Sequence, residues 1–153
     1  MQTQTLNSAK KRTRADVYRD RVKIRLATNE AGPLIADLLR ENGIELVSAD
    51  WKDIGGSWLI ATLDDDVIGV VQVLLGKPAG YLEFLFVKPS APFKFRAIAV
   101  RKLLIQGFAT LKFFGAQYVG GAVSTKNAKF RQVLTDLGFV KCSETELVIK
   151  RLV

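Results

Sequence analysis

The sequence predicts one α+β domain, in which a mixed β-sheet of about six or seven strands is flanked by about four helices. Short runs of β-branched and aromatic residues alternate with longer runs that have the apolar spacing of helices. The hydrophobic fraction of 48% and the charged fraction of 25% are ordinary for a globular protein. A chain of 153 residues is also long enough to bury a single core.

The first 21 residues are predicted to form a basic N-terminal arm, followed by a domain over residues 22–153. Residues 1–25 contain eight basic and two acidic residues, so they carry +6 of the net charge of +8. The arm has few apolar residues with which to anchor itself. Two interpretations stay open: a solvated tail, or an arm that docks on an acidic protein surface or on nucleic acid.

The first half of the domain is predicted to form a strand, then helices, then a β-hairpin. Alternation of apolar and basic residues predicts a strand over 22–27, and apolar spacing predicts a helix over 30–42 that stops at Gly43. Residues 44–53 predict a second short helix. The runs 58–63 and 67–75 predict a β-hairpin around Asp64, Asp65 and Asp66, residues that tolerate turn geometry.

The second half predicts three further strands and two helices. The strands are expected over 81–89, 118–123 and 146–152. A long and unusually apolar helix is expected over 97–115, buried on more than one side. The last helix is expected over 127–137 and ends at Gly138.

The segment before the long helix predicts an anion site. A turn that carries Lys94 and Arg96 leads into the helix at Ala97. The unpaired N–H groups and the dipole at a helix start attract negative charge, and two neighbouring cations add to this attraction.

These motifs resemble the GNAT superfamily of N-acetyltransferases over about residues 22–152. The resemblance is carried by Leu85-x-Val87-x-Pro89, by the segment from Lys94 to Ala99, and by Asn127 followed by Gly138-Phe139. It implies acetyl-CoA as the cofactor and an amine on a small molecule or a protein as the acceptor. The residues that it implies for cofactor binding are Leu85, Phe86, Val87, Lys94, Phe95, Arg96, Ala97, Ile98, Ala99 and Asn127.

Glu83 is the candidate base for taking a proton from the amine. The predicted strand places it on the same face as Leu85 and Val87, and acids at the matching strand position serve as base in some GNAT enzymes. The alternative is a carboxylate that pairs with a lysine or a backbone group.

Two positions depart from the pattern of the superfamily. Leu134 stands where many GNAT enzymes have a tyrosine that protonates the leaving thiolate. Tyr118 is a candidate substitute for this catalytic hydroxyl, or else an ordinary sheet aromatic. Ala97 replaces the first glycine of the phosphate-binding turn, and its Cβ is expected to crowd the backbone N–H groups there.

These departures keep a second function open, a GNAT-like binding or assembly module that has lost catalysis. Its basic arm would then contact a protein or nucleic acid. GNAT-like proteins of similar size, also with leucine in place of the tyrosine, occur among tailed bacteriophages, so a virion or assembly component is one form of this hypothesis. A homo-oligomer or a larger assembly is compatible with either function.

Composition excludes several other classes of site. The chain has no histidine and one cysteine, Cys142, so histidine-dependent catalysis and an internal disulfide are excluded, and no metal site is expected. No apolar run is long enough to span a membrane, and the N-terminus lacks the apolar core of a signal peptide. We therefore expect a location in the cytoplasm or within a larger particle such as a virion.

Overall fold

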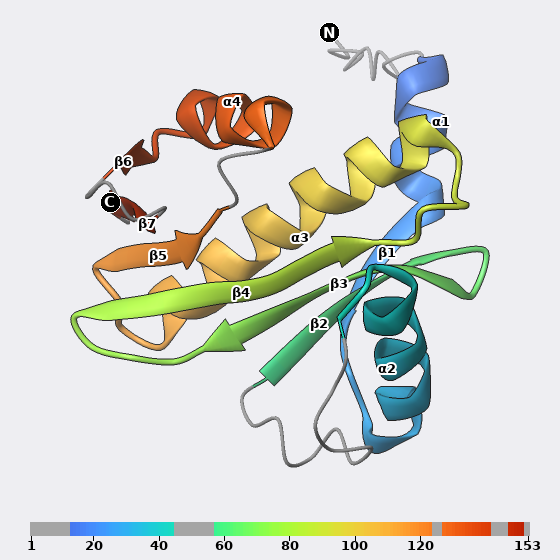
Figure 1. Ribbon diagram of the computed structural model, residues 1–153. Coiled ribbons are helices and arrows are strands. Elements are labelled where there is room, and N and C mark those ends of the chain that lie inside the picture. Colours follow the sequence, from blue (N-terminus) through green and yellow to red (C-terminus); the bar gives the residue numbers. More distant parts are fainter. Residues whose placement is uncertain (1–12, 45–56, 124–126, 142–146, 152–153) are drawn as a thin grey trace, which may run out of the picture.

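The computed structural model describes residues 13–44, 57–123, 127–141 and 147–151. The predicted short helix over 44–53 falls almost entirely outside this part, as do Cys142 and the first twelve residues of the predicted arm. The described part forms one seven-stranded mixed sheet with four α-helices and a short 3-10 helix, η1 (Figure 1). The predicted fold class is confirmed.

The elements follow one another in an order close to the predicted one. The helices are α1 (Arg14–Arg21), η1 (Asn29–Ala31), α2 (Gly32–Glu41), α3 (Phe93–Phe113) and α4 (Ala128–Asp136). The strands are β1 (Val22–Leu26), β2 (Ser57–Leu63), β3 (Asp66–Leu74), β4 (Ala79–Val87), β5 (Tyr118–Ala122), β6 (Val140–Lys141) and β7 (Leu147–Arg151). The helix α1 and the two-residue strand β6 were not predicted.

The sheet has the strand order β1-β2-β3-β4-β5-β7-β6, and its central pair β4 and β5 is parallel while the other pairs are antiparallel. The long helix α3 makes the crossover between the two parallel strands, as such a connection requires. The hairpin between β2 and β3 turns at Asp64 and Asp65, which have φ values of 48° and 74°. No helix in the described part is long and apolar enough to cross a membrane.

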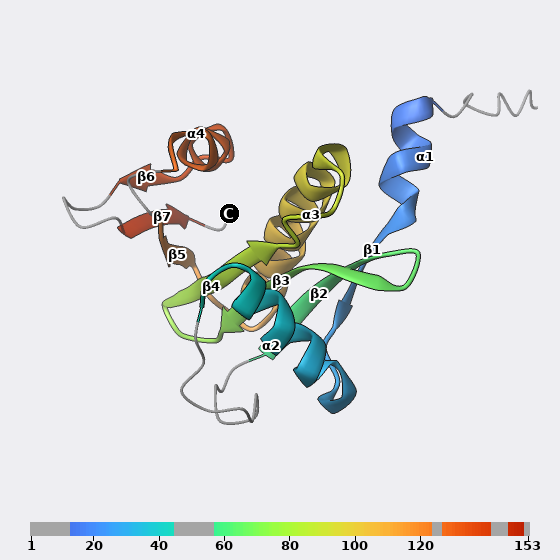
Figure 2. The ribbon, with the colours of Figure 1, turned by 45° about the vertical axis from the view of Figure 1, so that its right-hand side comes forward.

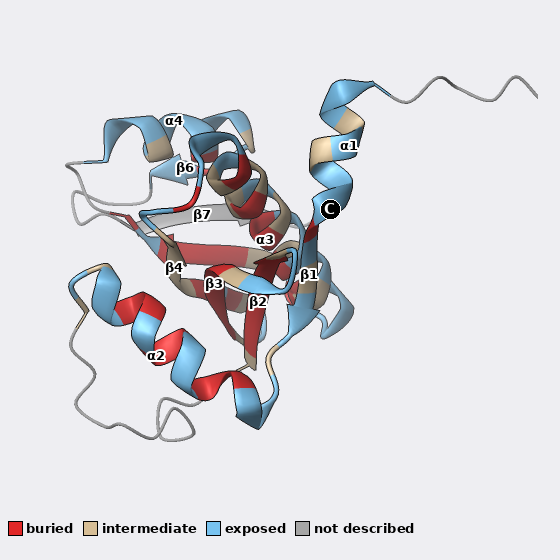
Figure 3. Cartoon of the chain, turned by 90° about the vertical axis from the view of Figure 1, so that its right-hand side faces the viewer, coloured by how far each residue is buried: buried red, intermediate tan, exposed pale blue. Residues whose placement is uncertain are grey.

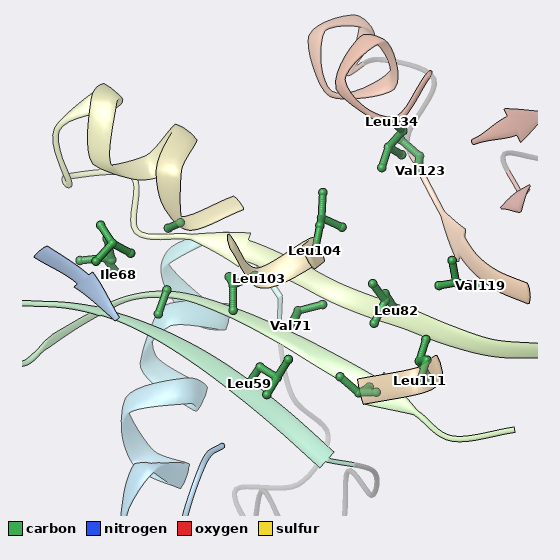
Figure 4. Close-up of a cluster of buried hydrophobic side chains, with 14 of the residues drawn as sticks. Leu59, Ile68, Val71, Leu82, Leu103, Leu104, Leu111, Val119, Val123 and Leu134 are labelled. Carbon is green, nitrogen blue, oxygen red and sulfur yellow. The ribbon is translucent and has the colours of Figure 1, made fainter. Parts of the chain in front are cut away.

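Helices cover both faces of the sheet (Figure 2). Leu103 and Leu111 of α3 pack on one face with Leu59, Val71 and Leu82, as Figure 4 shows. Ile35, Leu38 and Leu39 of α2 cover the other face over a second cluster. We call these the α3 face and the α2 face. Because the strands between them are buried on both sides, β2 and β3 read as almost continuous apolar runs.

Residues 14–21 of the predicted arm form α1, which packs beside the N-terminal end of α3. The helix begins with a capping box, in which Thr13 and Asp16 satisfy each other's backbone N–H groups. Tyr18 is its apolar anchor, and its ring meets the buried Phe95 edge-on at 5.7 Å between centroids. Most of α1 is otherwise exposed (Figure 3).

Candidate functional site

A cavity opens where the two parallel strands separate. β4 and β5 pair over Ala79–Tyr81 and Tyr118–Gly120 and have no further pairing beyond this point. The cavity that follows has a volume of about 270 Å³. The described residues that line it are Ile44, Leu82, Glu83, Phe84, Leu85, Phe86, Leu104, Gly120, Gly121, Ala122, Val123, Asn127, Phe130, Leu134 and Phe139.

The two strands are also close where the cavity begins. A Cβ added to Gly121 would lie 2.9 Å from the carbonyl oxygen of Leu82 on β4, closer than real Cβ atoms come to backbone. Glycine therefore lets β5 stay next to β4 up to the point of separation. Beyond it, the edge of β4 that faces β5 offers backbone N–H and C=O groups that no described strand uses.

A β-bulge in β4 lies in the cavity wall. Gln72 of β3 pairs with Glu83, and Val70 pairs with Phe86. The two residues Phe84 and Leu85 therefore lie opposite the single residue Val71. Phe84 has a φ of 48°, which is unfavourable for an aromatic residue. Its ring packs against Trp58 at 6.0 Å between centroids, in the cluster under α2. This packing helps to hold the bulge.

The bulge moves Glu83 to the α2 face of the sheet. Val71 and Val73 belong to the α3-face cluster, so Gln72 between them projects to the α2 face. Glu83 is paired directly with Gln72, and directly opposed residues project to the same face of a sheet. The predicted shared face of Glu83 with Leu85 and Val87 is therefore wrong, since those two side chains pack against the α3-face cluster. The extra residue inserted at the bulge changes the alternation between them.

Of the described residues in the cavity wall, Glu83 and Asn127 have polar side chains. Glu83 is half-buried and makes no ion pair with any described residue, so the alternative in which it pairs with a lysine gains no support. Asn127 caps α4, because its Oδ1 accepts a hydrogen bond from the N–H of Phe130 over 3.1 Å. Asn127 thus serves as an N-cap and also lines the cavity.

Among the described residues that line the cavity, none carries a hydroxyl for the leaving group. α4 places Leu134, which is 3% exposed, in the cavity beside Val123 (Figure 4). Tyr118 does not replace it. It pairs with Ala79 at the closed end of the β4 and β5 pairing and is not among the lining residues. The structure therefore does not bring Tyr118 and Glu83 together in the cavity.

The long helix begins at Phe93, four residues before the predicted start at Ala97. The turn is therefore Lys88–Pro92, closed by a hydrogen bond from the N–H of Ala91 to the carbonyl of Lys88 over 3.1 Å. Pro89 and Pro92 supply no N–H donor in it. No side chain caps the helix and its first turn contains no acid, so the positive end of the helix dipole is left uncompensated.

This earlier start changes the roles of the predicted phosphate-binding residues. Lys94 and Arg96 are helical and not part of the turn. Ala97 is exposed in the second turn, so the predicted crowding of the turn by its Cβ does not occur. The ammonium of Lys94 lies 3.8 Å from the ring centroid of Tyr18, on the side of α3 that faces α1.

The cavity collects only part of the predicted set. Leu85, Phe86 and Asn127 line it, together with Glu83. Phe95 and Ala99 are buried in the α3-face cluster, and Ile98 and Val87 pack against it. Phe84 and Leu104 also line the cavity and were missed, because neither the bulge nor the face of α3 that meets the cavity leaves a signal in the sequence.

Comparison with known proteins gives matches at the level of structure. Neither a protein-family model nor a curated protein matches the sequence. Three solved structures illustrate the likeness. The ribosomal-protein-S18-alanine N-acetyltransferase of Escherichia coli matches with a TM-score of 0.74 at 13% identity, covering 86% of this chain and 94% of that one. An acetyltransferase of the GNAT family from Staphylococcus aureus Mu50 matches with a TM-score of 0.69 at 14% identity, covering 86% of this chain and 99% of that one.

The third is the PaiA N-acetyltransferase of Thermoplasma acidophilum, solved in complex with coenzyme A. It has a TM-score of 0.68 at 17% identity and covers 85% of this chain and 98% of that one. The chain has the GNAT fold. The matches span almost the whole of these three proteins.

Proposed function

We propose that the protein is an N-acetyltransferase that transfers the acetyl group of acetyl-CoA to an amine of a small molecule or a protein. The observation that carries the proposal is the cavity between the separating strands of a GNAT fold, in whose mostly apolar wall the carboxylate of Glu83 makes no ion pair with a described residue. A carboxylate in such a wall can take a proton from the protonated amine that is to be acetylated.

The unpaired edge of β4 suits the pantetheine arm of the cofactor. That arm carries two amides in an extended chain, and an extended chain pairs with a free strand edge through backbone-like hydrogen bonds. The uncapped start of α3 suits the pyrophosphate, since its first N–H groups and its dipole favour an anion. Pro89 and Pro92 leave this turn with fewer donors, so we expect weaker phosphate binding than a turn rich in glycine would give.

The chemistry requires few groups from the protein. The amine nitrogen attacks the thioester carbon, the C–N bond forms and the C–S bond breaks. Glu83 accepts the proton lost by the amine, directly or through a water molecule. Leu134 cannot protonate the leaving thiolate, and none of the described lining residues carries a hydroxyl, so we assign that proton to solvent. We therefore expect slow turnover for this site.

The second expectation is a binding or assembly module without catalysis, which predicts that no amine is acetylated in this cavity. Leu134 in the wall agrees with either function. The structural matches are acetyltransferases, and the expectation of a bacteriophage or virion component gains nothing from them.

Thermal unfolding with acetyl-CoA tests the proposal. A ligand at about 100 times its dissociation constant stabilises the folded state by about 2.7 kcal/mol, which for this size raises the Tm by about 5–10 °C. We expect that shift at low and at moderate salt, followed by acetylation of an amine from a panel, detected by mass spectrometry and by release of CoA thiol. No shift with acetyl-CoA would contradict the proposal; a shift without any acetylated product would favour the module.

A further inference from the structure

The C-terminal end of α3 exposes two phenylalanine rings that touch each other. Phe113 is 84% exposed and Phe114 is 50% exposed. The rings meet edge to face, with 5.2 Å between their centroids and 89° between their planes. Phe113 lies nine residues beyond Leu104, the α3 residue in the cavity wall, which is about 14 Å along the helix axis. The two rings therefore form a surface separate from the cavity.

The outer side of α3 extends this apolar surface. A row of exposed residues spaced by four leads along the helix to Phe113, namely Arg101, Ile105 and Ala109. Ile105 is 50% exposed, and Lys112 is exposed next to Phe113. Single exposed apolar residues are ordinary, whereas a group of them along one row marks a surface that binds another molecule. Here the row also carries cations.

Positive charge surrounds the two rings. Residues 84–135 contain nine lysines and arginines and no acid. The C-terminal end of α3 lies beside the turn between β3 and β4 (Figure 1). Lys77 of that turn lies against Gly115, because a Cβ added to Gly115 would be 2.8 Å from the Lys77 Cε. Lys77 and Lys112 thus place two cations close to Phe113 and Phe114, which makes the surface both aromatic and basic.

We propose that this end of α3 binds the surface of an anionic phospholipid bilayer. The α3-end surface consists of Lys77, Ile105, Lys112, Phe113 and Phe114. The phenyl rings insert at the boundary between headgroups and acyl chains, and the ammonium groups lie among the anionic headgroups. The helix lies on the membrane and does not cross it. This binding does not depend on the proposed acetyl transfer.

Three other partners fit the α3-end surface less well. A second copy of the chain would bring cations opposite cations, which opposes association. A folded protein would need a pocket for two protruding rings, whereas a bilayer accepts them without one. Single-stranded nucleic acid stacks successive bases on aromatic faces. Rings at 89° to each other do not offer two parallel faces for such stacking.

Co-sedimentation with sucrose-loaded vesicles tests the proposal. We expect the full chain to bind vesicles of phosphatidylcholine with about one third phosphatidylglycerol, and to bind pure phosphatidylcholine much less. High salt should weaken the binding. Phe113→Ala should lower the partition coefficient by about tenfold, since it removes an inserted ring. Lys112→Gln should lower it by about three- to fivefold. Because Phe113 is 84% exposed, its replacement should leave the Tm unchanged.

Phe93→Ala is the matched control for the aromatic ring. Phe93 is 75% exposed at the opposite end of the same helix. Lys141→Gln, at an exposed position of β6, controls for the loss of one charge. These controls are needed because the basic N-terminal segment also attracts anionic lipid. Equal losses of binding for Phe113→Ala and Phe93→Ala would overturn the proposal, as would absence of binding by the unmodified protein.

Insertion of the ring has its own readout. The indole that Phe113→Trp introduces should be quenched by lipids with brominated acyl chains, measured as the difference from the unmodified protein, which has two tryptophans. Lack of additional quenching would overturn insertion at this position. Binding of a dT oligonucleotide that Phe113→Ala abolishes, without binding to vesicles, would overturn the proposal in favour of a nucleic-acid surface.

Discussion

The ammonium group of Lys102 on α3 donates a hydrogen bond to the carbonyl oxygen of Arg19 on α1 over 2.6 Å. It donates a second one to the carbonyl of Val22 over 2.7 Å. These acceptors lie at the C-terminal end of α1, where the helix dipole favours a cation. Desolvation by burial, and then the charge of Lys23, lower the pKa of Lys102. The contact joins the basic N-terminal segment to the domain.

Replacement of this lysine should loosen α1. Lys102→Met keeps the length of the side chain and removes both hydrogen bonds. We expect the Tm to fall by about 2–4 °C, corresponding to about 1 kcal/mol after discounting for partial exposure. The rate of amide hydrogen exchange should increase more in α1 than in the rest of the domain. Arg101→Met is the control, since it removes a charge from the neighbouring exposed position; an equal effect of both variants would show that charge alone matters.

Glu83→Gln tests the proposed base with little change in shape. Because the amide cannot accept the proton, we expect kcat to fall by at least about tenfold. The Kd for acetyl-CoA should stay unchanged, since the proposed contacts of the cofactor do not include this carboxylate. Steady-state kinetics at saturating acetyl-CoA and calorimetry measure the two effects. Glu41→Gln, at the exposed end of α2, controls for loss of a negative charge. Unchanged turnover would remove Glu83 from the mechanism.

The order of elements was predictable from the sequence, and the geometry of the site was not. The strands β2 and β3 follow apolar runs, and Gly43 and Gly138 end helices with φ values of 78° and 86°, as their positions predicted. The start of α3 was misplaced because Lys94 and Arg96 resemble turn residues of a known motif, whereas Pro92 at the N-cap determines where the helix begins.

The bulge at Phe84 explains the larger error. Strict alternation assigned Glu83 to the face of Leu85 and Val87, and one inserted residue reversed that assignment. A phenylalanine with positive φ has no local sequence signal, because tertiary packing against Trp58 stabilises it. The helix α1 was missed for a similar reason, since its one apolar anchor is Tyr18 and its partner Phe95 lies far along the chain.

The ion pair between Arg21 and Asp64 gives a pH dependence of stability. The hydrogen bond from the Arg21 guanidinium lowers the pKa of Asp64. Because the pKa of Asp64 is lower in the folded state, the pair stabilises the fold at pH values above the pKa of an aspartate in the unfolded chain, about 3.9. That contribution is lost as the pH falls through the folded value. The side chains are 44% and 60% exposed, so the effect is small and is screened by salt.

Asp64→Asn tests this pair, since asparagine also tolerates the φ of 48° at this position. The variant should unfold at a slightly lower Tm than the unmodified protein at pH 7. The difference should shrink as Asp64 becomes protonated and should also shrink in high salt. Asp65→Asn in the same turn is the control. A difference that persists at acidic pH would mean that the turn, and not the ion pair, is responsible.

Leu134→Tyr tests whether the missing hydroxyl limits the reaction. Because Leu134 lies in the cavity wall and is 3% exposed, a larger ring costs about 1–3 kcal/mol of stability. Leu134→Phe carries the same steric cost without the hydroxyl, so the ratio of the two kcat values isolates the proton donor. We expect the tyrosine variant to be at least about tenfold faster than the phenylalanine variant, because a positioned acid protonates the thiolate as it leaves. Equal kcat values for the two variants would show that thiolate protonation does not limit turnover, and the absence of tyrosine would then carry no argument against catalysis.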